Sequence, residues 1–375
     1  MLGKIVPKPI PCALIGLSLL TACTQEQTPR APEPKRLTVE QTSQLIKPSM
    51  PRGEFEAFWA TDIFAALDAF NADKSVENVC AIVAVIQQES GFKADPAVAN
   101  IRQILAKKIE KMQENPVLSI ALNLRLAQTA QNGKTFKANM QSIKTEREFE
   151  QWYNEFAAAK YSFLGLKAMR MDVAQLVTTA GSMQVSIDYA QSMASQLGQS
   201  SSNVREQVYS RAGGVLYGAS HLLNYPAAYS SPYYRFADFN AGHYASRNAA
   251  FQQMILNLTA NKSIGTDGDL LSYVDGAPKA SKTHQALTAL AVKQKSTLND
   301  VQILADLKRE KDADFTQTQT YQWLSQLHQK RFGKVLTEQI PSIVLKSDKI
   351  TRKLTTQWYA DSVLKRFKSC VARAN

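Results

Sequence analysis

The 375-residue sequence contains only four histidines and four cysteines, and it lacks any long hydrophobic run. The histidines show neither an H-E-x-x-H pattern nor a Cys-His spacing, so the usual zinc-site motifs are excluded. The apolar run at residues 13–22 is too short, at about 1.5 Å per residue, to cross a hydrocarbon layer of about 30 Å. No repeat of fixed period is present. The four histidines are His221, His243, His284 and His328.

The rest of the composition is that of an ordinary globular protein. Hydrophobic residues make up 45% and charged residues 20% of the chain, which excludes disordered, collagen-like and multi-spanning membrane proteins. Lysine and arginine outnumber aspartate and glutamate by 44 to 32, and the net charge of +12 favours an acidic partner. The basic pairs at residues 107–108 and 308–309 are typical of solvated helix faces. No nucleic-acid-binding signature accompanies them, so nucleic acid is not the expected partner.

The N-terminus predicts export. Lys4 and Lys8 precede the apolar run, as in a signal peptide over residues 1–22. The run ends in Leu-Thr-Ala-Cys, which resembles the bacterial lipobox, so Cys23 is the expected lipidation site and mature N-terminus. An ordinary secretory signal with an incidental cysteine is the alternative. Thr24, in place of an aspartate, resembles the signal for sorting to the outer membrane, and several acyl chains would anchor the protein firmly.

Residues 23–38 are predicted to form a lipidated tether, because three prolines and almost no apolar residues favour an extended chain. Removal of the signal peptide takes away two lysines and no acidic residue, so the mature chain keeps a charge of +10. The predicted location is the periplasmic face of the outer membrane, with outer-membrane lipid as one partner.

Two cysteines, Cys80 and Cys370, remain for the folded part once Cys12 leaves with the signal and Cys23 is acylated. Because the periplasm is oxidising, we predict that they form a disulfide. Two buried free thiols are the alternative. The disulfide would tie the C-terminal helix to the helix that carries Glu89.

Helical periodicity dominates from about residue 39 onward, so the fold is predicted to be mainly α. Apolar residues at positions 76, 79, 83 and 86 recur at helical spacing behind two possible N-caps, Asp73 and Ser75. Further helices are expected at residues 101–130 (one or two, divided near Pro116), 146–161, 187–197, 204–223 and 243–258. After a break rich in glycine and aspartate at 265–276, helices are expected at 283–293, 298–310, 320–331 and 355–372.

Glu89 is the candidate general acid because of its place in this periodicity. It follows Ile82, Val85 and Ile86 by seven, four and three residues, so on a helix it shares their buried face. Loss of hydration there would disfavour the carboxylate and raise its pKa, as a proton donor near neutral pH requires. A solvated glutamate at a helix end is the alternative.

Two later segments strengthen the interpretation of Glu89 as a general acid. Residues 180–185 read Ala-Gly-Ser-Met-Gln-Val, and residues 236–242 read Phe-Ala-Asp-Phe-Asn-Ala-Gly. Together with Glu-Ser-Gly-Phe at residues 89–92 and a glycine-containing stretch at 214–223, they resemble, in order, the signatures of lytic transglycosylases of the lysozyme-like superfamily. The resemblance covers about residues 75–95 and 178–250 and implies a lysozyme-like catalytic body.

The resemblance also implies site residues, position by position. Glu89 would be the catalytic acid, and the positions that match the family's other motif residues would contact or surround the glycan. For two of these, Met183 and Phe239, packing in the core is the alternative. The implied substrate-binding residues are Ser90, Met183, Gln184, Phe239 and Asn240.

The implied reaction cleaves the glycan strands of peptidoglycan without water. Glu89 would protonate the glycosidic oxygen between N-acetylmuramic acid and N-acetylglucosamine, then accept a proton from the muramyl 6-hydroxyl group as it attacks the anomeric carbon. The product would be a 1,6-anhydromuropeptide. Because the substrate's N-acetyl group assists, one enzymic carboxyl group suffices, and no metal or cofactor is expected.

The sequence departs from the family pattern at three places. A helical insertion at about residues 97–177 separates the first two motifs. Ser182 stands where leucine is usual. Phe239 stands where tyrosine is usual, which removes a hydroxyl group that commonly lies near the catalytic acid. The tyrosines that could compensate are Tyr233, Tyr234 and Tyr244.

Two other functions remain open. A lysozyme-type hydrolase on the same fold would need a second carboxylate, for which Asp188 and Asp238 are candidates. Asp188 is expected on a helix surface, and Asp238 is expected to cap a helix or form a salt bridge. A catalytically silent peptidoglycan-binding lipoprotein would be consistent with the three departures.

The predicted organisation follows from these segments. A signal peptide (1–22) and a lipidated tether (23–38) precede a transglycosylase body (39–265) with its insertion. A C-terminal helical region (266–375) packs on the body, because the predicted disulfide makes the C-terminus part of the same unit.

Overall fold

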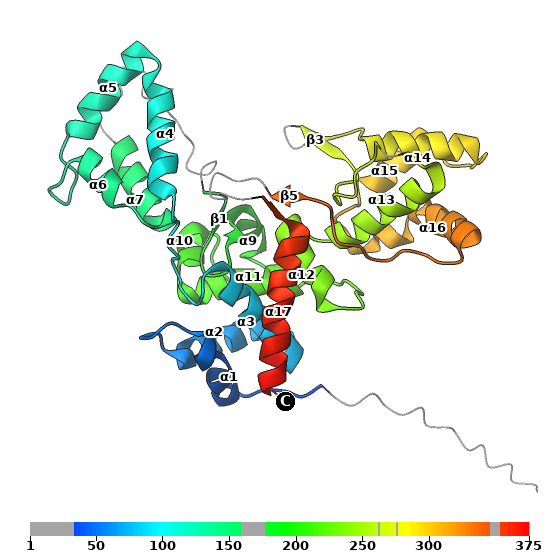
Figure 1. The fold of residues 1–375 in the computed structure, drawn as a ribbon, viewed down its shortest axis with the longest axis horizontal. Helices are drawn as coiled ribbons and strands as arrows, with labels where there is room; N and C mark the ends of the chain where they lie inside the picture. The colour runs from blue at the N-terminus through cyan, green and yellow to red at the C-terminus, as the bar shows by residue number, and fades with distance from the viewer. Residues whose placement is uncertain (1–33, 159–176, 262, 275–276, 346–352, 375) are drawn as a thin grey trace, which may run out of the picture. The chain divides into compact units, whose positions relative to one another are not determined.

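The structure is a computed structural model that describes residues 34–158, 177–261, 263–274, 277–345 and 353–374 (Figure 1). Helices dominate these residues, and the named strands form two-stranded antiparallel hairpins, so the predicted mainly α fold is confirmed. The predicted signal peptide, Cys23 and most of the predicted tether lie outside the described residues. None of the described helices is both long and apolar enough to cross a membrane.

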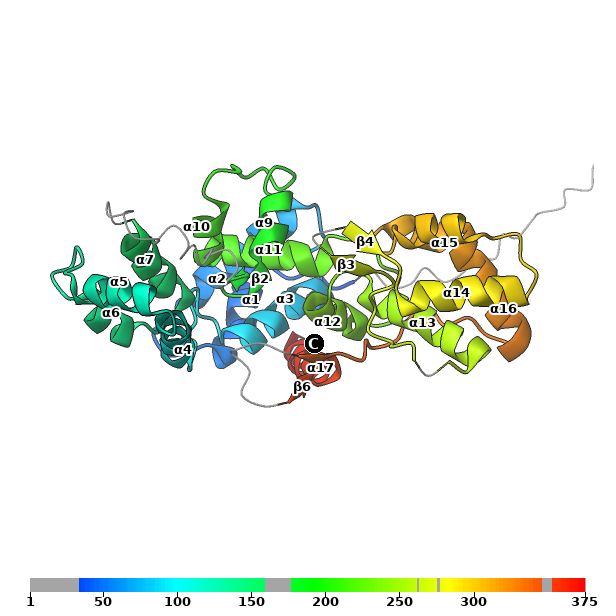
Figure 2. The ribbon, with the colours of Figure 1, turned by 90° about the horizontal axis from the view of Figure 1, so that it is seen from above.

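The first hydrophobic core is built by helices from distant parts of the chain. Near the N-terminus lie α1 (Val39–Ile46), the 3-10 helix η1 (Lys47–Ser49), α2 (Glu56–Ala69) and α3 (Val76–Glu89). These meet α11 (Arg211–Leu223), α12 (Pro232–Ala241) and the C-terminal α17 (Thr356–Ala374). Figures 1 and 2 both show α17, in red, beside α3 and α12. This core therefore holds the elements that carry Glu89 and residues 236–242.

The sequence of α3 explains its place at the centre of this core. The hydroxyl of Ser75 accepts a hydrogen bond from the amide of Asn78 at 3.2 Å, so Ser75 is the N-cap. Asp73 instead pairs with Arg36. Every residue from 79 to 86 is buried, so the middle of α3 is enclosed on all sides, whereas Glu77 in its first turn is exposed. Ile82, Val85 and Ile86, which share a helical face with Glu89, are fully buried as expected, and Glu89 itself is half-buried at the end of that face.

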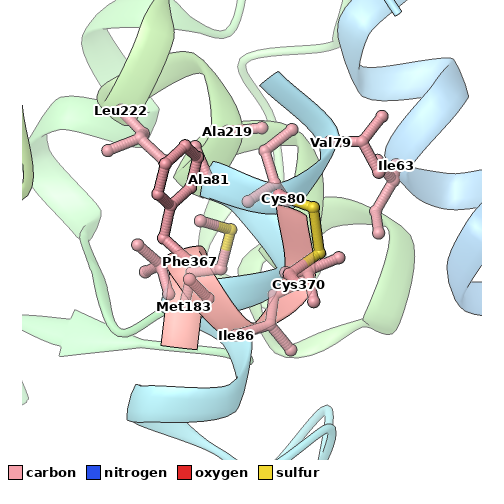
Figure 3. Packing of buried hydrophobic residues seen from close by; sticks show 14 of the residues in the cluster. Ile63, Val79, Cys80, Ala81, Ile86, Met183, Ala219, Leu222, Phe367 and Cys370 are labelled. Carbon is pink, nitrogen blue, oxygen red and sulfur yellow. A yellow bond between two sulfur atoms is a disulfide. The ribbon is translucent and has the colours of Figure 1, made fainter. Parts of the chain in front are cut away.

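A disulfide joins α3 to α17 inside the core (Figure 3). The bonded residues are Cys80 and Cys370, the two cysteines that the sequence analysis paired, and their Cα atoms lie 5.6 Å apart. Figure 3 shows the bond among buried side chains that include Met183 and Phe367. The bond links positions 290 residues apart and fixes the C-terminal helix to the helix of Glu89.

The second core contains most of the predicted insertion. Its helices are α4 (Ile101–Gln113), α5 (Pro116–Ala127), α6 (Phe136–Ser142) and α7 (Glu146–Ala157). They share this core with the hairpin β1 (Thr179–Ala180) and β2 (Val185–Ser186), and with α9 (Ile187–Met193) and α10 (Val204–Tyr209). The insertion helices thus belong to the same core as the hairpin of the second motif.

The third core is formed by α13 (Ala245–Thr259), α14 (Lys282–Lys293), α15 (Asp300–Leu307), the 3-10 helix η4 (Ala313–Gln317) and α16 (Gln319–Phe332). The hairpin of β3 (Ser272–Val274) and β4 (Ala277–Lys279) precedes α14, and β5 (Val344–Leu345) pairs with β6 (Leu354–Thr355) before α17. The predicted boundary at residue 265 falls within this core, because α13 packs with α14 and α16.

One predicted helix needs correction, and one helix was not predicted. The single helix predicted at residues 204–223 is two helices, α10 and α11. Ser210 between them leaves the helical region with φ −77° and ψ 157°, and its hydroxyl accepts from the amide of Gly213 at 3.0 Å to cap α11. Helix α12 was not predicted, although Ser231 and Pro232 supply an N-cap and a proline in its first turn.

Replacing both Cys80 and Cys370 by alanine is expected to lower the free energy of unfolding by about 2–5 kcal/mol, because the disulfide restricts the unfolded chain over a long loop. Urea unfolding of a soluble form, followed by circular dichroism, measures this loss. Wild-type protein in reductant is the control and should lose a similar amount. Equal unfolding midpoints for the oxidised wild type and the double variant would contradict the prediction, as would two alkylatable thiols in denatured, unreduced protein.

Candidate functional site

Glu89 is the last residue of α3, where the chain leaves the core. Ser90 follows it as the C-cap, and its hydroxyl donates to the carbonyl of Ile86 at 3.1 Å and accepts from the amide of Lys93 at 3.3 Å. These bonds end the helix sharply. Phe92, which has a left-handed φ of 64°, is fully buried against Trp59 with ring centroids 5.4 Å apart. Glu89 is thus half-buried on a well-anchored helix end.

The second motif lies in the β1–β2 hairpin. Gly181 occupies the turn with a φ of 76°, and an added Cβ would lie 2.2 Å from the carbonyl oxygen of Val208, so only glycine fits. Ser182 is fully buried against Gly214, where an added Cβ would lie 2.9 Å from the serine hydroxyl. A small side chain at position 182 suits this close approach to α11.

Met183 is a core residue. Its side chain has no exposed surface and packs in the first core beside Gly218, where an added Cβ would approach the methionine Cβ to 2.4 Å. The prediction that Met183 contacts the glycan is therefore corrected, because a fully enclosed thioether cannot touch a ligand at the surface. Its role is to fix the hairpin to the core that also contains α3.

Gln184 contacts a carboxylate that the sequence analysis did not identify. Its side-chain amide donates to Glu146 Oε2 and to the carbonyl of Gly181, each at 3.3 Å, and its backbone has a left-handed φ of 49°. Glu146 begins α7 and is 2% exposed. The capping box of Thr145 and Glu148 predicts that helix start, but no sequence pattern predicts the burial of the intervening glutamate.

The third motif ends α12. Phe239 is half-buried, and its ring centroid lies 5.1 Å from that of His221. Asn240 is exposed, and its side-chain oxygen accepts a hydrogen bond from the hydroxyl of Thr356 at 3.1 Å. Thr356 is the first residue of α17, so the start of the C-terminal helix lies at the third motif.

Asp238 is a structural residue of the third motif. It is fully buried and accepts from the hydroxyls of Tyr229 at 2.6 Å and Tyr225 at 3.1 Å, and from the amides of Tyr244 and Ser246. Burial raises the pKa of its carboxyl group, and the hydrogen bonds oppose this shift. The amide bonds cap α13, so the expected capping role is confirmed. Asp188, the other candidate, is exposed on α9 as expected.

A row of aromatic rings lies beside Phe239. The rings of His221 and His243 stack with centroids 4.5 Å apart, and Tyr189 packs edge-on against both. Tyr225 stacks on His243 at 4.1 Å. Burial, followed by repulsion from His243, lowers the pKa of His221 to about 3, and burial also lowers that of His243. Both imidazoles are therefore neutral near neutral pH.

The other two histidines lie away from this row. His284 is buried beside Asp300, and His328 lies between the side chain of Asn257 and the carbonyl of Lys334. Among the residues that the structure describes, no group of three or more histidine, cysteine or acidic side chains could hold a metal ion.

Comparison with known proteins identifies the family. Residues 54–373 match the family described as a protein of unknown function (DUF1615), and the chain belongs to that family. The match includes Glu89 and all but the last residue of α17. Among individual proteins, the chain is 35% identical over 369 residues to the uncharacterized protein YaiW of Escherichia coli (strain K12), covering 96% of this chain and 97% of that protein. No solved structure matches it.

His221 makes the fold sensitive to acid. Its pKa is lowered to about 3 in the folded state, whereas the unfolded value is about 6.5. Between these values the unfolded chain binds a proton that the folded protein excludes, so stability falls as pH decreases through this window. Burial of Asp238 acts in the opposite direction, because its raised pKa lets the folded state bind a proton more tightly.

The His221→Phe variant isolates the histidine because it keeps an aromatic ring. Relative to wild type, it is expected to lose about 2–3 kcal/mol less stability when the pH falls from 7 to 4.5. Urea unfolding at the two pH values measures the difference, and the values at pH 7 give the baseline. An identical pH dependence in the two proteins would mean that His221 does not remain neutral in the folded state.

Proposed function

We propose that this protein is a lytic transglycosylase that cleaves peptidoglycan between N-acetylmuramic acid and N-acetylglucosamine, with Glu89 as general acid and base. One observation carries the proposal. The end of α3, with Glu89, and the end of α12, with Asn240, both lie at the first turns of α17. Met183 anchors the second motif in the same core. Three motifs far apart in sequence are thus supported by one set of packed helices.

The local chemistry supports an acid–base role for Glu89. The carboxyl group lies at the edge of an apolar core, where it is partly removed from water, next to the buried hydroxyl of Tyr359. Such surroundings favour proton transfer by a single carboxyl group. Asn240 is exposed nearby and offers an amide for acetamido or hydroxyl groups of a sugar, and half-exposed Phe239 offers an apolar ring for a sugar face.

The second-carboxylate candidates favour the transglycosylase over a hydrolase. Asp238 is enclosed and accepts four hydrogen bonds from protein groups, so it is committed to the fold. Asp188 lies exposed on α9. Glu146 is near the second motif but is 2% exposed and bonded to Gln184. A base that activates water opposite Glu89 is therefore not evident among the described residues, whereas the intramolecular reaction needs none.

The proposed setting is the periplasmic face of the outer membrane, with lipid attached at Cys23. The mature charge of +10 suits an acidic polymer such as peptidoglycan, whose peptides carry carboxylates. The tether would let the folded part reach the glycan while the lipid stays in the membrane. Peptidoglycan strands and membrane lipid are thus the proposed partners, and no cofactor is required.

A muropeptide mass analysis tests the proposal. A soluble form that begins just after Cys23 is incubated with purified sacculi, and its products are compared with those of Glu89→Gln. The wild type is expected to release 1,6-anhydromuropeptides, and the variant to be at least about 100-fold slower, because an amide cannot donate the proton. Glu77→Gln is the matched control, since it removes the same charge from an exposed position on the same helix.

The products distinguish the alternatives. Reducing-end products in place of anhydro ends would indicate hydrolysis. Binding to sacculi without products would favour a catalytically silent glycan-binding lipoprotein. Equal turnover by the wild type and Glu89→Gln, with unchanged circular dichroism, would remove Glu89 from the mechanism.

A further inference from the structure

The hydroxyl missing at Phe239 is not supplied by the tyrosines that the sequence suggested. The hydroxyl of Tyr233 donates to Asp361 at 2.6 Å, and that of Tyr244 lies 3.4 Å from the carbonyl of Pro226. Tyr234 packs against the ring of Tyr233. A hydroxyl group near Glu89 must therefore come from another part of the chain if it is present.

Tyr359, on the second turn of α17, has its hydroxyl next to Glu89. The residue is 5% exposed, and its oxygen is buried with no hydrogen-bond partner of ordinary geometry among the described residues. The carboxylate of Glu89 is the acceptor within its reach. Leaving a buried hydroxyl without a partner is unfavourable, so this contact is favoured. Catalytic hydrogen bonds are often long before substrate binds and tighten in the complex.

The register of two antiparallel helices supports this contact independently. The disulfide fixes Cys370 of α17 beside Cys80 of α3. From that link, Glu89 lies nine residues further along α3, about 13.5 Å, and Tyr359 lies eleven residues back along α17, about 16.5 Å. The two displacements agree to about 3 Å, so the disulfide and the close packing of α17 on α3 bring Tyr359 level with Glu89.

A second contact fixes the N-terminal end of α17, where Tyr359 lies. Thr356 donates its hydroxyl to Asn240 at 3.1 Å, one turn before Tyr359. The helix is therefore held at both ends, by the disulfide and by the third motif. Its first turns have little freedom to move away from Glu89.

We propose that Tyr359 is a positioning residue for Glu89, and that α17 supplies from the C-terminus the hydroxyl that Phe239 lacks. This inference rests on the proposed function for its catalytic consequence. The phenol donates to one oxygen of the carboxyl group, so the other oxygen is directed at the glycosidic oxygen of the glycan.

The electrostatics are consistent with a permanent donor. Burial, and then the negative charge of Glu89, raise the pKa of Tyr359 well above its ordinary value, and Arg366 on the same helix opposes this shift. The phenol thus stays protonated near neutral pH. Its hydrogen bond favours the charged form of the carboxyl group that accepts it.

The Tyr359→Phe variant tests the inference, because it keeps the ring and removes only the oxygen. Carbon-13 NMR of labelled glutamate, with Glu89→Gln to assign the signal, gives the pKa of Glu89. We expect this pKa to rise by about one unit in Tyr359→Phe, since a charge-assisted hydrogen bond to the anion is lost. With sacculi, kcat is expected to fall about tenfold while KM stays within about twofold, and the alkaline limb of the pH profile should move to higher pH.

Two further variants provide controls. Tyr233→Phe removes a hydroxyl that bonds Asp361 of the same α17, so it should leave the pKa of Glu89 unchanged. Phe239→Tyr, combined with Tyr359→Phe, should restore part of the lost kcat, because it returns a hydroxyl to the position usual in the family that the motifs resemble.

The outcomes separate the inference from the proposed function. An unchanged pKa of Glu89 in folded Tyr359→Phe overturns the inference, whether or not the wild type is active. A raised pKa with undiminished kcat overturns the positioning role. A raised pKa, together with a wild type that releases no anhydromuropeptides, keeps the contact and rejects the proposed function.

Discussion

The packing of α17 against α3 is the constraint on which the rest of the structure depends. The disulfide between Cys80 and Cys370 closes most of the folded chain into one loop, and it does so within the core, where both cysteines are buried. The loop that this bond closes contains the insertion and the third core. The same pairing brings residues 359 and 356 to the ends of α3 and α12, so one contact stabilises the fold and arranges the site.

Around the packed helices α3 and α17, the polar groups of the candidate site are mostly buried rather than exposed charges. Asp238 holds the turn from α12 to α13 through hydrogen bonds from two tyrosines and two amides. The stacked imidazoles of His221 and His243 are kept neutral by desolvation. The four hydrogen bonds to Asp238 hold this turn rigidly, and the proposed acid–base catalysis by a single carboxyl group requires a rigid arrangement.

Much of the fold could be predicted from the sequence because it is encoded locally. The helix of Glu89 follows from its apolar spacing and the N-cap Ser75. The cysteine pair has no local signal and was predicted from the expected export and the expected loss of Cys12 and Cys23 from the folded part. The division of residues 204–223 at Ser210 was missed, because the hydrophobic pattern continues across the break while a capping serine ends one helix and starts the next.

The candidate site could be predicted only in part. Glu89 and Asn240 were identified from motifs, but Tyr359 lies 270 residues beyond Glu89 and depends on helix packing that no local pattern reports. Met183 was assigned to the glycan because motif positions do not reveal which side chain of a hairpin faces the core. The burial of Glu146 beside Gln184 is likewise a tertiary contact between the insertion and the second motif.

The most direct test of this account is a crystal structure of the soluble Glu89→Gln form with a peptidoglycan tetrasaccharide. If Glu89 is the general acid, the central glycosidic oxygen lies within about 3.2 Å of the side chain at position 89. Asn240 is then close to the sugar, and the hydroxyl of Tyr359 lies on the opposite side of the side chain at position 89. A glycan bound away from the ends of α3 and α12, or no bound glycan at concentrations that saturate sacculus binding, would contradict it.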